Sequence, residues 1–109
     1  MKYQYHFGYI ELSDGEKIPT IKLPEEIELV SAFLHQMNQQ GPWFLDAVNQ
    51  VLLGAEEFKE TKGEFYKIRI REDYTEISDV FDEGEVCKIE TKEFKEILEI
   101  WIKETMKKA

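Results

Sequence analysis

Phe65-Tyr66-Lys67-Ile68-Arg69-Ile70-Arg71 carries the clearest structural signal in the chain, because from Tyr66 onward its side chains alternate between apolar and cationic with a period of two. The apolar members Tyr66, Ile68 and Ile70 share one face of a strand, and the cationic members share the other. A strand with one apolar and one charged face is typical of an antiparallel sheet that is buried on one side only. The stretch therefore predicts a half-buried strand in such a sheet.

Turn signals on both sides of this strand indicate further strands. Thr61-Lys62-Gly63 turns into it, and Ile77 and Phe81 continue the core side of a partner strand. Asp82-Glu83-Gly84 then turns into a strand over residues 85–90. We therefore expect an antiparallel meander of three or four strands.

After the meander the apolar period becomes that of a helix. Thr91 is predicted to cap this last helix. Its apolar residues recur at i, i+3, i+4, i+7 and i+8, namely Phe94, Ile97, Leu98, Trp101 and Ile102. Since the helix and the sheet each have one apolar face, we expect the helix to pack across the sheet and to bury Trp101 and Leu98 with Ile68 and Ile70.

Two helices are expected upstream of the meander. Pro24 and the glutamates after it suit the first turn of a helix over about residues 24–39. Gly41-Pro42 stops that helix and starts a second one, for which Gly54 is the C-terminal cap. The sequence thus predicts a helical hairpin.

The N-terminal residues alternate as a strand does, and the return over residues 17–23 reads as a second strand that Pro19 confines to a sheet edge. The alternation gives the first strand an aromatic face. We expect its aromatic residues to belong mainly to the core, together with two at the start of the second helix; the set is Tyr3, Tyr5, Phe7, Tyr9, Trp43 and Phe44. A partly exposed Tyr or Trp would instead be an anchor for a partner.

Runs of strands and runs of helices thus stay separate along the chain, in the order ββααββββα. This order predicts an α+β fold in which an antiparallel β-sheet packs against a helical hairpin and a C-terminal helix. The sheet consists of an N-terminal strand or hairpin plus a meander of three to four strands. A chain of 109 residues that is 42% hydrophobic suits one α+β domain over residues 1–109.

The charge of the chain excludes some classes of partner. There are 23 acidic and 14 basic residues, for a formal net charge of −9. A nucleic-acid-binding protein needs clustered Lys and Arg, so direct binding of nucleic acid is disfavoured. Residues 3–10 lack the apolar core of an export signal, and no apolar run approaches the roughly 18 residues of a transmembrane helix. The single Cys87 suits a reducing compartment, and we expect a cytoplasmic protein with no membrane partner.

Much of the negative charge lies in residues 72–85, which contain no cation. We call the acidic residues of this stretch the acidic segment: Glu72, Asp73, Glu76, Asp79, Asp82, Glu83 and Glu85. One interpretation is a solvated hairpin whose charges prevent edge-to-edge aggregation. The other is a partner-binding surface that docks a basic protein. Calcium is disfavoured because the stretch lacks the regular ladder of oxygen ligands of a calcium loop.

No motif pairs a nucleophile with a base, supplies a set of metal ligands or forms a phosphate-binding loop. His6 and His35 are expected to be exposed or hydrogen-bonded structural residues, and Cys87 to be a small buried hydrophobe. We therefore predict no catalytic, cofactor-binding or metal-binding residues, and a protein that is not an enzyme.

Three stretches resemble the small cytoplasmic immunity proteins of bacterial polymorphic and contact-dependent toxin systems. They are Gly41-Pro42-Trp43-Phe44 before a helix that ends Leu52-Leu53-Gly54, residues 63–70, and residues 94–101. The resemblance implies stoichiometric inhibition of one cognate toxin, commonly a basic nuclease, by masking its active site. The acidic segment would bind that toxin. The alternatives are a small ligand-binding domain or enzyme with a pocket between the helical hairpin and the sheet, or a structural subunit of a complex.

Overall fold

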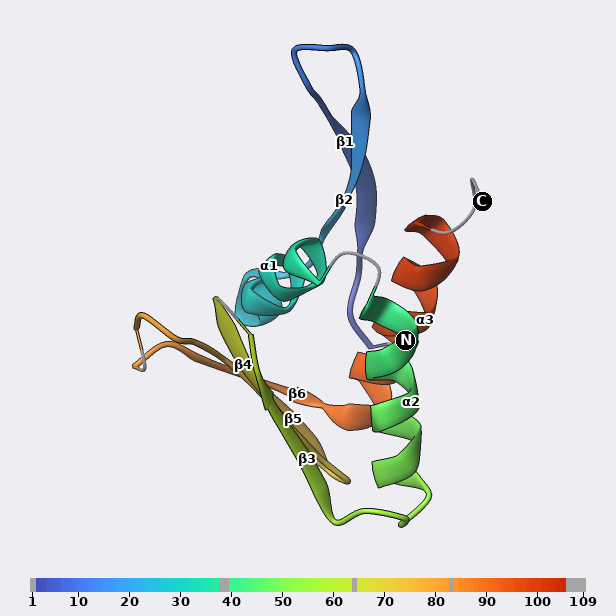
Figure 1. Cartoon of the computed structure of the whole chain (residues 1–109), viewed down its shortest axis with the longest axis vertical. Coiled ribbons are helices and arrows are strands. Elements are labelled where there is room, and N and C mark those ends of the chain that lie inside the picture. Colours follow the sequence, from blue (N-terminus) through green and yellow to red (C-terminus); the bar gives the residue numbers. More distant parts are fainter. Residues whose placement is uncertain (1, 38–39, 64, 83, 106–109) are drawn as a thin grey trace.

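The computed structural model describes residues 2–37, 40–63, 65–82 and 84–105. It has the predicted α+β fold (Figure 1). The elements in chain order are β1 (His6–Glu11), β2 (Lys17–Lys22), the 3-10 turn η1 (Glu25–Ile27), α1 (Glu28–Gln36), α2 (Gly41–Leu52), β3 (Phe58–Lys62), β4 (Tyr66–Arg71), β5 (Tyr74–Asp79), β6 (Val86–Glu90) and α3 (Thr91–Thr105).

Strands β3 to β6 form the predicted antiparallel meander, in the order β3-β4-β5-β6. All three α-helices lie on one face of this sheet, with α1 over β5 and β6 and α2 over β3 and β4 (Figure 1). The alternation in β4 has the expected effect, since Ile68 and Ile70 are buried under the helices. The cationic side chains of Lys67 and Arg69 alternate with these isoleucines and lie on the opposite face of the sheet, which the helices do not cover.

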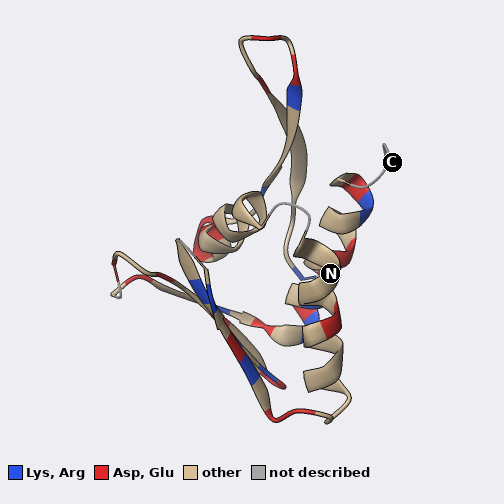
Figure 2. Cartoon of the chain, in the orientation of Figure 1, with Lys and Arg blue, Asp and Glu red and all other residues tan. Residues whose placement is uncertain are grey.

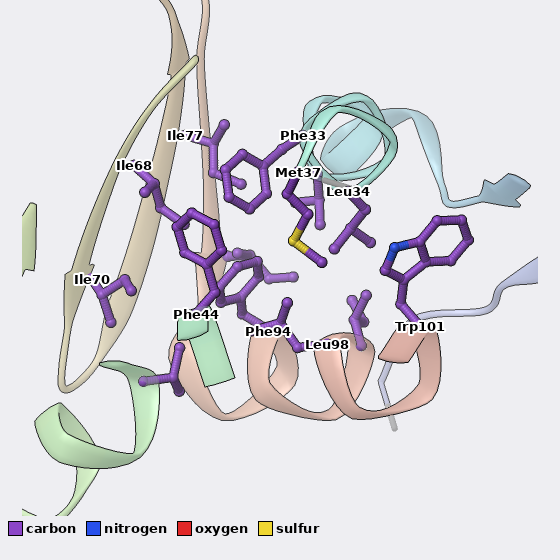
Figure 3. Packing of buried hydrophobic residues seen from close by; sticks show 14 of the residues in the cluster. Phe33, Leu34, Met37, Phe44, Ile68, Ile70, Ile77, Phe94, Leu98 and Trp101 are labelled. Carbon is purple, nitrogen blue, oxygen red and sulfur yellow. The ribbon is translucent and has the colours of Figure 1, made fainter. Parts of the chain in front are cut away.

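Helix α3 directs its apolar stripe into the core, and it packs against α2 as well as over β5 and β6. Phe94, Leu98 and Trp101 point from α3 toward side chains of the sheet and of α1 (Figure 3). The prediction that Trp101 and Leu98 are buried in one cluster with Ile68 and Ile70 is confirmed.

The start of α3 differs from the prediction. Thr91 is the first residue of the helix and is completely buried, and its hydroxyl donates a hydrogen bond to the Arg71 carbonyl. The Thr75 hydroxyl then donates to Thr91 Oγ1 at 2.9 Å. The capping role was wrong because this side chain bonds to β4 and β5 rather than to the backbone of its own helix.

Strands β1 and β2 pair only with each other and project from the body of the molecule; we call this hairpin the arm (Figure 1). The prediction that its aromatic face belongs to the core is wrong for Tyr5, Phe7 and Tyr9, of which 38%, 37% and 54% are exposed. A strand pattern shows that side chains share a face, but a second layer of structure has to cover that face before it is buried.

Two other aromatic predictions fail for a similar reason. Phe81 was expected to continue the core side of β5, but the strand ends at Asp79 and 78% of Phe81 is exposed. Phe44 is buried as expected, whereas half of its neighbour Trp43 is exposed, because Trp43 lies on the outer side of α2.

The arm is attached to the body at both of its legs. On the β1 side, the Tyr3 hydroxyl donates to Glu90 Oε1 at 2.6 Å, and the Lys2 ammonium contacts the same carboxylate at 2.7 Å. On the β2 side, Ile21 is buried in the core. The root of the arm is therefore fixed, while its tip projects.

The helical hairpin follows the predicted ranges with small changes. The first helix is divided into η1 and α1, and residues 38–39 of its expected end lie outside the described residues. Gly54, with φ +81°, ends α2 as predicted. Gly41 does more than interrupt the chain, since a Cβ there would lie 2.7 Å from Ile102 Cγ1 of α3. The missing side chain lets α2 and α3 approach each other.

Candidate functional site

The structure divides the acidic segment between two ends of the sheet. Glu72 and Asp73 lie in the turn between β4 and β5, whereas Asp82 and Glu85 lie in the turn between β5 and β6. Consecutive turns of an antiparallel meander are at opposite ends of the sheet, so these pairs are a strand length apart. Glu83 lies outside the described residues. The segment therefore does not form one continuous surface.

The middle of the segment lies among cations. Glu76 is in register with Arg69 of β4 on one side and with Lys88 of β6 on the other. On the same uncovered face, Glu60 forms ion pairs with Arg69 at 2.6 Å and with Lys67 at 3.5 Å. The hydrogen bond from Arg69 lowers the pKa of Glu60. This face of the sheet carries both signs of charge and is not an acidic surface.

Asp79 belongs to the other face. It is in register with Tyr66 and follows the alternation of Thr75 and Ile77, whose side chains are buried under the helices. Glu85 lies two residues before the buried Cys87, so its side chain points to the same face of the sheet as that of Cys87. Both carboxylates therefore leave the sheet on the helix side, at the point where the apolar core ends.

Asp79 and Glu85 face the glutamates at the start of the first helix. A hollow of about 410 Å³ separates the two groups, and we call it the acidic groove. Its carboxylates come from η1 and α1 on one side and from β5 and the turn before β6 on the other: Glu25, Glu26, Glu28, Asp79 and Glu85. Acidic residues lie both on α1 and along the β5–β6 hairpin in Figure 2. The three glutamates were interpreted only as favourable residues for a helix N-terminus, and no signal in the sequence indicates that they face Asp79.

Tyr66 and Cys87 also line the groove, together with Leu29, Ala32 and Val86. Burial raises the pKa of Tyr66, and the carboxylates of Asp79 and Glu85 raise it further. Burial also raises the pKa of the Cys87 thiol, which donates a hydrogen bond to the Glu26 carbonyl at 3.7 Å. Both groups are therefore protonated at neutral pH, and the thiol is the small buried hydrophobe that the sequence predicted rather than a nucleophile.

The other candidate residues take structural positions. His6 is exposed on the arm, and His35 accepts a hydrogen bond from the Ile21 N–H, so both fit the expectation for structural histidines. Within the described residues, no group of three or more His, Cys, Asp or Glu side chains is arranged to hold a metal ion. None of the helices in the described part of the chain is long and apolar enough to span a membrane.

A second hollow, of about 390 Å³, lies between the helical hairpin and the sheet, where an alternative small-molecule site was expected. Its lining includes Phe33, Met37 and Phe65. Among the described residues around it, Lys62 and Tyr66 are the only ionisable side chains. The described residues of this lining therefore do not include a carboxylate or histidine for acid–base chemistry.

Comparison with known proteins gives one informative match. The chain is 34% identical over 105 residues to a protein of Bacillus cereus that is named "Immunity protein". The match covers 93% of this chain and 86% of that protein, so the two share nearly their whole length. No family model matches the chain, and no solved structure matches it.

Proposed function

Because this chain belongs to the immunity protein family, we propose that it is a non-enzymatic inhibitor that neutralises one cognate toxin of a bacterial polymorphic or contact-dependent system. It acts in the cytoplasm by binding a basic surface of the toxin, such as the active-site surface of a nuclease, and by covering the active site. Its own acidic surface supplies the complementary charge.

The acidic groove is the observation that supports this proposal. Five carboxylates from two distant parts of the chain converge on one hollow, although like charges repel and weaken the free protein. The repulsion becomes an attraction once cations of a partner enter. A concentrated field of this kind speeds the encounter with an oppositely charged surface and excludes acidic partners.

The acidic segment then has two roles. We propose that Asp79, Asp82 and Glu85 lie at the toxin interface, because Asp79 and Glu85 line the groove and Asp82 lies in the turn beside it. Glu83, which lies outside the described residues, is included because it follows Asp82 in the sequence. Glu72, Asp73 and Glu76 lie elsewhere on the sheet, and within this proposal they contribute to the long-range field that attracts the toxin.

Asp79 and Asp82 are poor choices for a test of the interface. Asp79 Oδ1 accepts the Phe81 N–H at 2.8 Å, and Asp82 Oδ1 accepts the Gly84 N–H at 3.2 Å. Replacing either carboxylate would disturb the turn as well as the charge. Glu26 and Glu85 are exposed residues on opposite sides of the groove, and their substitution changes the charge with less effect on the backbone.

The test compares Glu26→Gln/Glu85→Gln with Glu57→Gln/Glu99→Gln, which removes the same charge from exposed positions outside the groove. The probe is the protein encoded by the reading frame directly upstream of the gene, which the proposal predicts to contain the toxin domain. Association with the groove variant should be slower by on the order of 10-fold at low salt, while the control stays close to the wild type. In cells that express the toxin, the groove variant should protect less well than the wild type, and the control variant should protect as well as the wild type.

Three results would contradict the proposal. Equal losses in both variants would show that only the net charge matters, and unchanged binding of the groove variant would place the groove outside the interface. If the wild-type protein neither binds the toxin domain nor protects cells from it, the protein is not the immunity protein of that toxin.

A further inference from the structure

We propose that Phe81, backed by Phe65, is the apolar anchor of the toxin interface, and that the toxin receives it in an apolar recess rimmed by Lys or Arg. This inference rests on the proposed function and adds the chemistry of the partner's contact surface. It concerns two rings that lie outside the core and beside the acidic groove.

The two rings form an exposed aromatic pair. Phe81 is 78% exposed and Phe65 is 42% exposed, and their centroids are 6.3 Å apart. Large rigid rings provide much contact area for little loss of side-chain entropy, so exposed aromatic residues are frequent anchors of protein interfaces.

The backbone holds this pair in place. The Val80 N–H donates to the Phe65 carbonyl at 3.0 Å and extends the pairing of β5 with β4 by one residue. The Phe81 N–H donates to Asp79 Oδ1 at 2.8 Å, and Asp82 Oδ1 accepts a backbone N–H of the following turn at 3.2 Å. An anchor whose backbone is ordered before binding loses less entropy when the complex forms.

Three of the other exposed rings, Trp43, Tyr74 and Phe58, have a cation of the same chain over them. The ammonium of Lys59 lies 5.6 Å from the centroid of Trp43, and that of Lys88 lies 4.4 Å from the centroid of Tyr74. The guanidinium of Arg71 likewise lies 5.8 Å from the centroid of Phe58.

The pair Phe65 and Phe81 differs from these rings, because no Lys or Arg of the described residues lies over either of them. An aromatic face attracts a cation. The position that an internal cation occupies at Trp43, Tyr74 and Phe58 is thus open to a cation of a partner at this pair.

The surroundings of the pair specify the same chemistry. Phe81 stands two residues after Asp79, and Phe65 immediately precedes Tyr66; both Asp79 and Tyr66 line the acidic groove. A partner surface that covers the two rings also covers the Asp79 carboxylate, and burying a carboxylate without a counter-charge is costly. Arg suits the rim best, because its guanidinium stacks on a ring and binds a carboxylate at the same time.

The test uses Phe81→Ala and the double variant Phe65→Ala/Phe81→Ala, with Leu53→Ala as the control because 83% of Leu53 is exposed at the far end of α2. Dissociation from the predicted toxin domain that also serves as the probe of the proposed function should be on the order of 10- to 100-fold faster for Phe81→Ala, with little change in the association rate. The control should match the wild type. The thermal melt of free Phe81→Ala should match that of the wild type, because 78% of Phe81 is already exposed.

The failure of this inference differs from the failure of the proposed function. If the wild type binds and protects but both phenylalanine variants dissociate at the wild-type rate, the anchor is overturned and the proposed function stands. If the wild type itself does not bind the toxin domain, the proposed function is overturned and the anchor with it. A Phe81→Ala variant that only associates more slowly would also overturn the anchor, because that is the signature of charge rather than of apolar contact.

Discussion

The Nε2 atom of His35 accepts the backbone N–H of Ile21 at 3.0 Å, and this hydrogen bond joins helix α1 to the root of the arm. The imidazole also lies against the ring of Trp101, with the centroids 5.6 Å apart. Nε2 can accept only when it carries no proton. Burial lowers the pKa of His35 below its ordinary value of 6.5, so the ring is neutral at neutral pH.

Acid should therefore loosen the arm at its root. A histidine whose pKa is lower in the folded than in the unfolded protein contributes stability that is complete above pH 6.5 and is lost as the pH falls through the folded pKa. We expect the hydrogen-exchange protection of the Ile21 amide to decrease over that acidic range. The variant His35→Gln keeps an acceptor oxygen that does not titrate. In this variant the hydrogen-exchange protection of the Ile21 amide should not decrease over the same pH range. Wild-type protection that stays constant through the range would contradict the prediction.

Trp101 should dominate the stability of α3. It is 4% exposed and packs in the core with Leu98 and Leu34 (Figure 3). Trp101→Ala should lower the free energy of unfolding by about 3–5 kcal/mol, as the truncation of large buried aromatics does. Urea titrations would measure the change. Trp43→Ala is the matched control and should cost clearly less, because half of Trp43 is already exposed; equal losses would show that α3 does not dock as described.

The N-terminal leg of the arm should depend on ionised Glu90. Hydrogen bonds from Lys2 and Tyr3 lower the pKa of Glu90 to about 2. Burial and the contact with Glu90 raise the pKa of Tyr3 to about 12, so the phenol remains a donor. Because the pKa of Glu90 is lower in the folded protein, its contribution to stability is present above pH 4.5 and is lost as the pH falls toward 2.

Two variants test this attachment. Tyr3→Phe removes one hydrogen bond to a partly exposed carboxylate and should cost about 1 kcal/mol at neutral pH. The wild type should lose stability between pH 4.5 and 2 in part because Glu90 becomes protonated. Glu90→Gln should remove this part of the loss and leave the part that comes from other carboxylates. If the two variants and their combination have additive effects on stability, Tyr3 and Glu90 are not coupled in solution.

The free protein should become slightly more stable when the charge of the acidic groove is reduced. Glu85 lines the groove with four other carboxylates, and Glu85→Gln removes its repulsion from them. A gain of up to about 0.5 kcal/mol is expected from an exposed site. Added salt should stabilise the wild type more than the variant, because it screens the same repulsion. A loss of stability in Glu85→Gln would show that this carboxylate makes a favourable contact in the free protein.

The helices, the strands and much of the core could be predicted from the amino-acid sequence alone. The alternation around Ile68 and the helical stripe of Phe94 and Leu98 predicted both the elements and their buried faces, because the direction of a side chain is fixed by the backbone geometry of a few neighbouring residues. The concentration of acidic charge and the absence of a catalytic motif were also visible in the sequence alone.

Which faces are covered and which charged side chains lie close together depends on the tertiary structure. The aromatic alternation of β1 predicted a strand, but Tyr9 is exposed because, among the described residues, no second sheet or helix layer covers this part of the arm. The sequence grouped Asp79 with Glu76, whereas strand parity places Glu76 between Arg69 and Lys88 and places Asp79 opposite Glu26 in the groove. The local sequence period determines the direction in which a side chain points. The residues of other elements that face this side chain depend on the register and packing of segments that are remote along the chain.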